Sequence, residues 1–442
     1  MLKISKSLFV LFIVVALMLL VAACSDAGKK PKEDPKKADG ASTETMTEFT
    51  EMTFNPGSFD NPGTCGGCHP DIYEAWSGSK HAVAWKDELF RADYNQAHQE
   101  TDGATDEFCG GCHAPVALRT GQLPPHDGSN FDNTAKQGIS CDFCHTVTKV
   151  VEPFNMRNIS EPGKNKLGPR NDGNSPYHEV VYSELHTKSE FCGSCHTVIH
   201  PTTNVGLITT YDEWLETEFA EKDITCQKCH MTPTPGVGKN PGKSAPSGIE
   251  RDSVATHYFV GGSSFSFKNI GSAVHAQKAE ERLRSAAELK LEGKITEQGL
   301  ELTTHVTNIG AGHNIPTGVS YIRKMWLEVT VIDENGKVIY ESGHINEGNQ
   351  VDPDAVFYRK LFEDAEGNVS GKSWTAESIA YDRRIAHNET DTETYLIDAS
   401  GETFTANVRL MYRSFSQEAL DQKNNITQQV ESVEMAAAEI KL

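Results

Sequence analysis

Two kinds of hydrophobic pattern divide the chain near residue 289. Beyond that point apolar and polar residues alternate with a period of two, which is typical of half-buried β-strands, and turn sequences such as Asp-Glu-Asn-Gly at 333–336 separate the runs. Several short strands with turns between them predict an all-β sandwich over residues 289–442. The expected strands cover 289–295, 300–307, 321–332, 338–341, 392–397, 406–414 and 427–438.

Before residue 289 the apolar runs are short, and glycine and proline recur, so we expect little regular structure. Helical periodicity predicts one helix over 70–100, which Gly78 is positioned to interrupt, and another over 211–221. An amphipathic linking helix is expected over 271–288, where alanine and leucine alternate with charged residues. With so little apolar sequence, this part of the chain needs another source of hydrophobic core.

The first 24 residues have the composition of a targeting segment. Lys3 and Lys6 precede an uncharged apolar run that ends in Val-Ala-Ala-Cys24, and this ending resembles the lipobox of bacterial lipoproteins. In those proteins the cysteine becomes the new N-terminus and carries diacylglycerol, so Cys24 is the expected lipidation site. An ordinary signal peptide and an uncleaved anchor are the alternatives. Residues 25–60 are rich in Lys, Pro, Asp and Glu and predict a disordered tether.

The net charge limits the class of partner. A formal charge of −21 over 442 residues argues against nucleic acid and favours basic or metal-rich partners. With the targeting segment, we expect an exported protein that is lipid-anchored at Cys24. Ser25 follows the cysteine, as in lipoproteins sorted to an outer membrane, and the protein then faces either the periplasm or the cell surface.

Five copies of Cys-x-x-Cys-His lie between residues 65 and 230. This motif predicts covalent attachment of c-type haem, in which both cysteines form thioethers and the histidine becomes the proximal iron ligand. Zinc or thioredoxin-like sites fit less well, because a histidine directly follows every cysteine pair. The eleventh cysteine is Cys24, so none remains for a disulfide. The thioether residues are Cys65, Cys68, Cys109, Cys112, Cys141, Cys144, Cys192, Cys195, Cys226 and Cys229, and the proximal ligands are His69, His113, His145, His196 and His230.

Five covalently bound c-type haems would supply the missing core. The predicted fold is therefore a mainly irregular and α-helical multihaem cytochrome domain over 61–270, with a haem-packed core, followed by the linking helix and the β-sandwich. An internal repeat appears within the first domain, because 107–113 is echoed by 190–196 and 139–141 by 224–226. We interpret haems two and three, and haems four and five, as two copies of a dihaem unit.

The sixth ligand of each iron decides the chemistry, because a second histidine saturates the iron and an open position allows substrate to bind. His69, Trp76 and His81 have the spacing seen in the cytochrome c-554 family, which residues 61–260 resemble. In that family the histidine corresponding to His81 caps a later haem whose motif follows a Gly-x-x run, as Gly138 precedes Cys141 here. The resemblance therefore implies that His81 is the distal ligand of haem three. Five motifs instead of four depart from the tetrahaem type, so its haem order is not carried over.

Other histidines are further candidates for distal ligands. By the same resemblance, His186 occupies a distal-ligand position before the fourth motif, and His178 is similar in placement to a ligand of haem one. His257 follows haem five, and His313, in a glycine-rich loop at 308–318, either reaches a haem across the domain boundary or lies in an exposed turn. Reserve candidates are His126, His200 and His275, and the histidines expected to be structural are His98, His305, His344 and His387.

These features predict a pentahaem cytochrome that transfers electrons in anaerobic or extracellular respiration. Its partners would be redox proteins such as other cytochromes, or an extracellular acceptor, and the membrane through its lipid anchor. Some related multihaem cytochromes form filaments by lending a histidine to the next subunit, so a homo-oligomer or filament stays open.

The alternative is a haem-dependent reductase or oxidase of a small nitrogen or sulfur compound, which needs one five-coordinate haem. Pentahaem nitrite reductases use Cys-x-x-Cys-Lys at that haem, and the chain has no such motif. We therefore favour a carrier and assign no catalytic residue.

Overall fold

The computed structural model describes residues 54–401, 403–421 and 428–442, all within one compact unit, Phe49–Leu442. The targeting segment with Cys24, and the tether as far as residue 53, lie outside the described residues. Within the described residues, none of the helices combines the length and the apolar character needed to span a bilayer.

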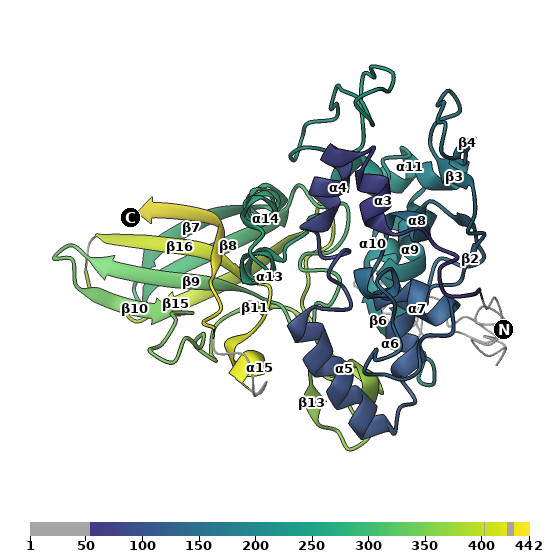
Figure 1. Ribbon diagram of the computed structural model, residues 1–442. Coiled ribbons are helices and arrows are strands. Elements are labelled where there is room, and N and C mark those ends of the chain that lie inside the picture. The colour runs from purple at the N-terminus through teal and green to yellow at the C-terminus, as the bar shows by residue number, and fades with distance from the viewer. Residues whose placement is uncertain (1–53, 402, 422–427) are drawn as a thin grey trace, which may run out of the picture. The chain divides into compact units, whose positions relative to one another are not determined.

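Short helices and loops make up the chain before residue 264 (Figure 1). The helix predicted over 70–100 is two helices, because α4 (Pro70–Ser77) ends at Gly78 and α5 (Glu88–Thr101) starts afresh. The carboxylate of Asp87 caps α5 by accepting a hydrogen bond from the backbone of its third residue. The remaining helices before residue 210 are α3 (Pro62–Gly66), α6 (Asp106–His113), α7 (Pro115–Arg119), η1 (Ala135–Gln137), α8 (Cys141–Cys144), η2 (Glu184–Thr187) and α9 (Ser189–His196).

The helix predicted over 211–221 is also divided, into α10 (Thr210–Leu215) and α11 (Glu218–Glu221), and α12 (Cys226–His230) follows. Three two-stranded sheets lie between these helices, and the sequence did not predict them because their strands are only three or four residues long. They pair β1 (Val147–Val150) with β2 (Asn158–Ser160), β3 (Asn165–Gly168) with β4 (Glu179–Tyr182), and β5 (Thr197–Ile199) with β6 (Gly206–Thr209).

A helix leads directly into the β-rich part of the chain. α14 (Ala273–Ala286), preceded by α13 (Ser264–Asn269), passes without a loop into β7 (Ala287–Thr296), within two residues of the predicted boundaries. Ala276, Ala279 and Leu283 are buried along α14, at the three- and four-residue spacing of an amphipathic helix.

Two antiparallel sheets follow, and their strands match most of the predicted ranges. The larger sheet has the order β10-β9-β16-β17 with β11 also paired to β9, and the smaller has the order β15-β8-β7 (Figure 1). The strands are β8 (Gly299–Asn308), β9 (Lys324–Asp333), β10 (Val338–Ser342), β11 (Phe357–Tyr358), β15 (Thr390–Ile397), β16 (Phe404–Arg413) and β17 (Val433–Lys441), with a short helix α15 (Gln417–Asp421) before β17.

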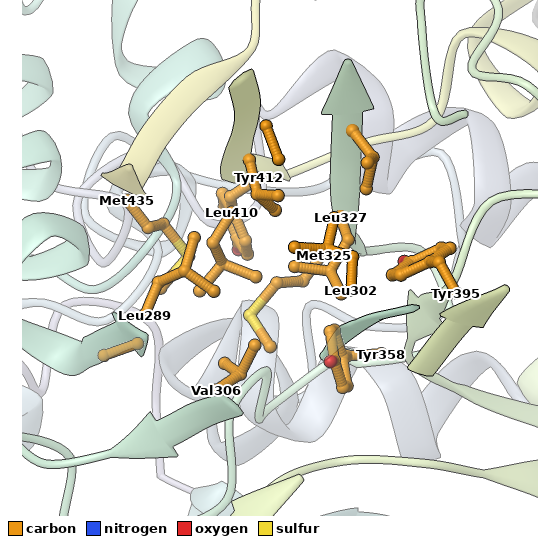
Figure 2. Close-up of a cluster of buried hydrophobic side chains, with 14 of the residues drawn as sticks. Leu289, Leu302, Val306, Met325, Leu327, Tyr358, Tyr395, Leu410, Tyr412 and Met435 are labelled. Carbon is orange, nitrogen blue, oxygen red and sulfur yellow. The ribbon is translucent and has the colours of Figure 1, made fainter. Parts of the chain in front are cut away.

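One hydrophobic core joins the two sheets. Leu302 and Val306 from the smaller sheet meet Met325, Leu327 and Leu410 from the larger one (Figure 2). Alternate residues of β8 are buried, as a strand with one face toward a core requires. The two sheets therefore pack face to face, as in a sandwich.

A third small sheet departs from the predicted pattern. It has the order β13-β12-β14, from β12 (Lys360–Glu363), β13 (Val369–Ser370) and β14 (Ser378–Asp382), and a short turn η3 (Ser373–Thr375) lies within it. The sequence did not predict it because every residue of β14 is exposed, so its strand has no apolar alternation.

Leu327→Ala should lower the free energy of unfolding of the β region by about 2 to 5 kcal/mol, because it removes a fully buried side chain between the two sheets. Leu396→Ala is the matched control on β15, where the side chain is 78% exposed, and should change the free energy of unfolding by no more than about 0.5 kcal/mol. Guanidinium denaturation followed by circular dichroism measures both. Equal losses in the two variants would contradict the assigned core.

Candidate functional site

Each Cys-x-x-Cys-His segment lies in or beside one short helix. The second and fourth segments end the eight-residue helices α6 and α9, and the third and fifth coincide with α8 and α12. The first begins in α3 and ends in the turn before α4. Within one helical turn two cysteines three positions apart share a face, so both can reach one porphyrin edge.

The repeated glycine within two of these motifs has a packing reason. A methyl group on Gly110 would come within 2.1 Å of Leu123, and one on Gly193 within 2.7 Å of Tyr211. Both distances are shorter than any non-bonded carbon contact, so a larger residue would displace the helix. The sequence repeat between 107–113 and 190–196 therefore marks equivalent helices that pack closely on a neighbour.

Four of the five motif histidines have the same fixed orientation. Nδ1 donates to a backbone carbonyl in each of them, which leaves Nε2 with a free lone pair for a metal. The donor–acceptor distances are 2.6 Å from His69 to Ser244, 3.1 Å from His113 to Ala84, 2.6 Å from His145 to Leu167 and 2.9 Å from His230 to Val260.

Four motif histidines also stand opposite a second histidine at nearly the same spacing. The ring centroids are 6.4 Å apart for His69 and His178, 6.2 Å for His196 and His81, 6.4 Å for His145 and His257, and 6.3 Å for His230 and His313. A bond from a transition metal to an imidazole nitrogen is about 2 Å long and that nitrogen lies about 1.1 Å from the ring centre, so one ion between two rings separates their centres by about 6.2 Å. The spacing fits one iron atom in each pair.

Several of the paired rings are buried, and burial favours the neutral form that binds iron. Burial lowers the pKa of His81 and His230 to about 3, and that of His257 to about 4. Three of the second histidines also donate from Nδ1 to a backbone carbonyl, at distances of 2.9 to 3.1 Å. They are His178, His257 and His313.

The structure changes one assignment made from the resemblance. His81 was expected to cap the third motif, but its ring faces His196 of the fourth motif at 6.2 Å. Its backbone does lie beside the third motif, because its carbonyl accepts a hydrogen bond of 2.9 Å from Ile139. The backbone at His81 therefore lies beside the third motif, while its side chain points to the fourth. His257, and not His81, stands opposite His145 of the third motif.

His186 lies beside the third motif. Its Nε2 donates to the carbonyl of Cys144 at 3.0 Å, and its Nδ1 is buried without a hydrogen-bond partner among the described atoms. It lies 5.8 Å from His145, but no motif histidine of the fourth segment faces it among the described residues. By contrast, His178 is placed opposite the first motif, and His313 reaches the fifth motif from the β region.

The second motif differs from the other four. In the described part of the chain, no histidine ring stands opposite His113 at the 6.2 to 6.4 Å spacing. Phe90 instead stacks on its ring, with centroids 3.6 Å apart and planes inclined by 3°. Burial lowers the pKa of His113 to about 4, so this ring is also neutral.

The reserve candidates are engaged elsewhere. Both nitrogens of His275 are hydrogen-bonded, to Ala75 and Ser272, and both nitrogens of His200 are engaged as well. Hydrogen bonds within the β region hold His305, His344 and His387, as expected for structural residues. His98 and His126 lie together in a separate cluster.

Cysteines of different motifs are neighbours in space, and their thiols stand here for the thioether sulfurs of attached haem. Interactions between thiols connect the first motif to the third, the second to the fourth, and the fourth to the fifth. Electrostatic interaction places Cys144 of the third motif near Cys195 of the fourth. The five motifs thus form one connected group whose spatial order differs from the sequence order.

A buried cation provides an independent test of the fit to haem. Arg119 is 3% exposed, lies 5.5 Å over the ring of Phe143 in the third motif and interacts with Cys195 of the fourth. Burial lowers its pKa to about 10, so it stays charged at neutral pH, yet its Nε and Nη1 have no hydrogen-bond partner among the described atoms. The propionate carboxylates of a haem would supply the missing acceptors. The residues present fit the group.

Comparison with known families places the first part of this region. Residues 64–146 match the family model described as cytochrome c554 and c-prime. Over these residues the chain is similar to multihaem c-type cytochromes. The family resemblance inferred from His69, Trp76 and His81 is thereby confirmed, and with it covalently bound c-type haem. Multihaem cytochromes of this kind transfer electrons.

Comparison with solved structures extends the similarity over most of the chain. It is similar to a penta-heme cytochrome c552 from Thermochromatium tepidum, with a TM-score of 0.64 and 19% sequence identity, over 87% of this chain and 99% of that chain. At this identity the likeness concerns the fold. An ApaA-type protein from Bordetella pertussis reaches a TM-score of only 0.16, with 13% identity over 36% of this chain and 94% of that chain. No curated protein matches the chain.

Arg119→Met should lower the reduction potential of the neighbouring haem, because a nearby positive charge favours the ferrous state. A charge about 10 Å from an iron, at an effective dielectric constant of about 20, shifts the potential by roughly 50 to 100 mV. Spectroelectrochemical titration measures the shift. Arg284→Met, at an exposed arginine paired with Glu280, is the control and should leave all potentials in place. Equal titration curves for the two variants would show that Arg119 holds no haem.

Proposed function

We propose that this protein is an exported, lipid-anchored pentahaem cytochrome that transfers electrons in anaerobic or extracellular respiration. The four facing histidine pairs at 6.2 to 6.4 Å carry the proposal. Histidine on both sides saturates an iron and gives it a low potential, so such a centre exchanges electrons without binding substrate. Five attachment motifs within one connected group support a count of five haems.

The contacts between motifs support electron movement through the group. Neighbouring sulfurs lead from the first motif to the third, fourth and fifth, while the second joins at the fourth. The cysteines that would hold neighbouring haems therefore lie close together. The haems supply the redox chemistry, and the chain fixes their spacing and surroundings.

Export and anchoring rest on the sequence of the first 24 residues. Covalent haem attachment takes place outside the cytoplasm, which agrees with the targeting segment and with Cys24 as the lipidated residue. The outer membrane is the proposed location, on its periplasmic or cell-surface face. The formal charge of −21 suits a redox partner or acceptor with a basic or metal-rich surface.

The β region contributes directly to the proposed fifth centre. His313 lies in the loop after β8, and this loop is held by Glu213 of α10, which accepts hydrogen bonds from Asn314 and Thr317. Arg384 forms an ion pair with Glu213, and both side chains are less than 10% exposed. Burial alone would raise the pKa of Glu213, but Arg384 and Thr317 outweigh it and keep the pKa below its usual value. His313 is thus supplied to the fifth motif by the same chain. The remaining surface of the β region is the proposed docking site for redox partners or for a second copy of the chain.

His81→Ala should convert the haem of the fourth motif from low spin to high spin, because it removes one of two facing imidazoles. Electron paramagnetic resonance of the oxidised protein should then show one additional high-spin ferric haem per chain, and added imidazole should restore the low-spin signal. His186→Ala is the control and should leave the spectrum unchanged, because its Nε2 is bound to a carbonyl. An unchanged spectrum in His81→Ala would overturn this ligand assignment.

A second function is favoured by the surroundings of His113. An iron at the second motif would lack an opposing histidine within the described residues, which is what a reductase or oxidase of a small nitrogen or sulfur compound requires. The reduced wild-type protein should therefore bind one carbon monoxide per chain, measured by optical difference spectra against haem content. If no carbon monoxide binds, all haem irons are six-coordinate. That result would exclude the reductase or oxidase function and favour the electron carrier.

A further inference from the structure

Two histidines and an aspartate form a cluster that belongs to none of the haem motif pairs. His98 lies in the last turn of α5, Asp106 is the first residue of α6, and His126 lies in the loop after α7. One ligand atom from each of the three lies within 4.8 Å of the others. Three separate elements thus bring nitrogen and oxygen donors to one point.

The distances within the cluster are those between ligands of a single ion. His98 Nδ1 lies 2.8 Å and 3.0 Å from the two carboxylate oxygens of Asp106. Two ligands bonded to one metal at 2.0 to 2.1 Å, at angles between octahedral and tetrahedral, are separated by about 2.9 to 3.3 Å. The ring of His126 lies 3.5 Å from that of His98, inclined by 11°, so its nitrogens are close to the same point.

We propose that His98, Asp106 and His126 bind a divalent transition-metal ion, with zinc as the representative. Two imidazoles and one carboxylate are the donors that zinc, copper, nickel and non-haem iron accept in proteins. Three protein ligands leave at least one position for water. Side-chain exposures of 31% for His98 and 12% for Asp106 allow an ion to enter from solvent.

A hydrogen-bonded ion pair explains only part of this arrangement. It accounts for His98 and Asp106, but it gives no reason for a second imidazole stacked on the first at 3.5 Å. A shared cation accounts for both imidazoles and the carboxylate together, because one ligand atom from each of the three residues lies within 4.8 Å of the others. The one carboxylate then balances part of the charge of the ion.

Neighbouring residues hold the His126 loop in position. Arg91 donates to the backbone carbonyl of His126 at 3.1 Å, and its guanidinium lies 4.2 Å over the ring of Trp85. Tyr94 donates to the backbone carbonyl of Asp106 at 3.3 Å. Such contacts fix the orientation of ligands before an ion arrives, which strengthens binding.

The site is separate from the haem ligands but connected to one of the haem motifs. Asp106 begins the helix that ends at His113, and eight helical residues span about 12 Å. An ion at its start would lie about two turns from His113, although Cys109 of the second motif is only three residues from Asp106. The proposal does not depend on how any haem is capped, so it goes beyond the proposed electron transfer.

Equilibrium dialysis of the full haem-loaded chain against zinc, after treatment with a chelator, tests the site. Mass spectrometry of the dissolved metals gives zinc per chain, and the covalently held iron serves as the internal standard. We expect one zinc per wild-type chain. His126→Ala and Asp106→Asn should each weaken zinc binding at least tenfold while the iron content stays the same.

His305→Ala is the matched control, because His305 also lies beside a carboxylate, that of Glu292 at 3.7 Å, but in a two-residue arrangement. It should bind zinc like the wild type. If Asp106→Asn disturbs α6 and lowers the haem content, the zinc binding of His126→Ala alone tests the proposal. No zinc on the wild-type protein, or equal binding by His126→Ala, would overturn the proposal.

Discussion

A gap that accommodates one iron atom between two imidazole rings is the constraint on which the haem region depends. Each of the four pairs joins histidines 83 to 115 residues apart in the chain. A metal bridge between them would act as a cross-link that closes a long loop, and such cross-links remove much of the entropy of the unfolded chain. This explains how a region with short helices and ladders of three or four residue pairs can hold the motif cysteines and histidines in fixed positions.

The same constraint connects the cytochrome region to the β region. The loop with His313 follows β8, and Glu213, Thr317 and Arg384 hold it against α10 through a buried ion pair and hydrogen bonds. A buried pair of this kind is costly to break on one side, because the remaining charge stays in a medium of low polarity. The β region therefore has two roles: it forms a hydrophobic core of its own, and its His313 loop is held opposite His230 of the fifth motif.

The sequence predicted the parts of the fold that have a strong local pattern. Strand β8 and the first half of β16 alternate in burial, and the Cys-x-x-Cys-His motifs define five proximal histidines without any structure. The direction of a side chain is different, because it depends on packing between distant segments. His81 shows this, since its backbone touches Ile139 beside the third motif while its ring faces the fourth.

Proximity in sequence placed His186 before the fourth motif, whereas its ring lies 5.8 Å from His145 of the third motif. His98 was expected to be structural and His126 was a reserve candidate for a distal ligand, and only the fold brings both together with Asp106. β14 has no apolar alternation and was missed for that reason. In each case the deciding information lies in contacts between elements that are far apart in the chain.

The arrangement of neighbouring sulfurs has a consequence for the proposed transfer of electrons through the protein. The first, third, fourth and fifth motifs follow one another, whereas the second touches the group beside the fourth. The second motif is therefore a branch from a linear series formed by the other four motifs. If haems occupy all five motifs, an electron on the haem of the second motif would either return through the haem of the fourth motif or be used in a reaction at the second. Transfer among the other four haems would then not depend on the state of the haem at His113.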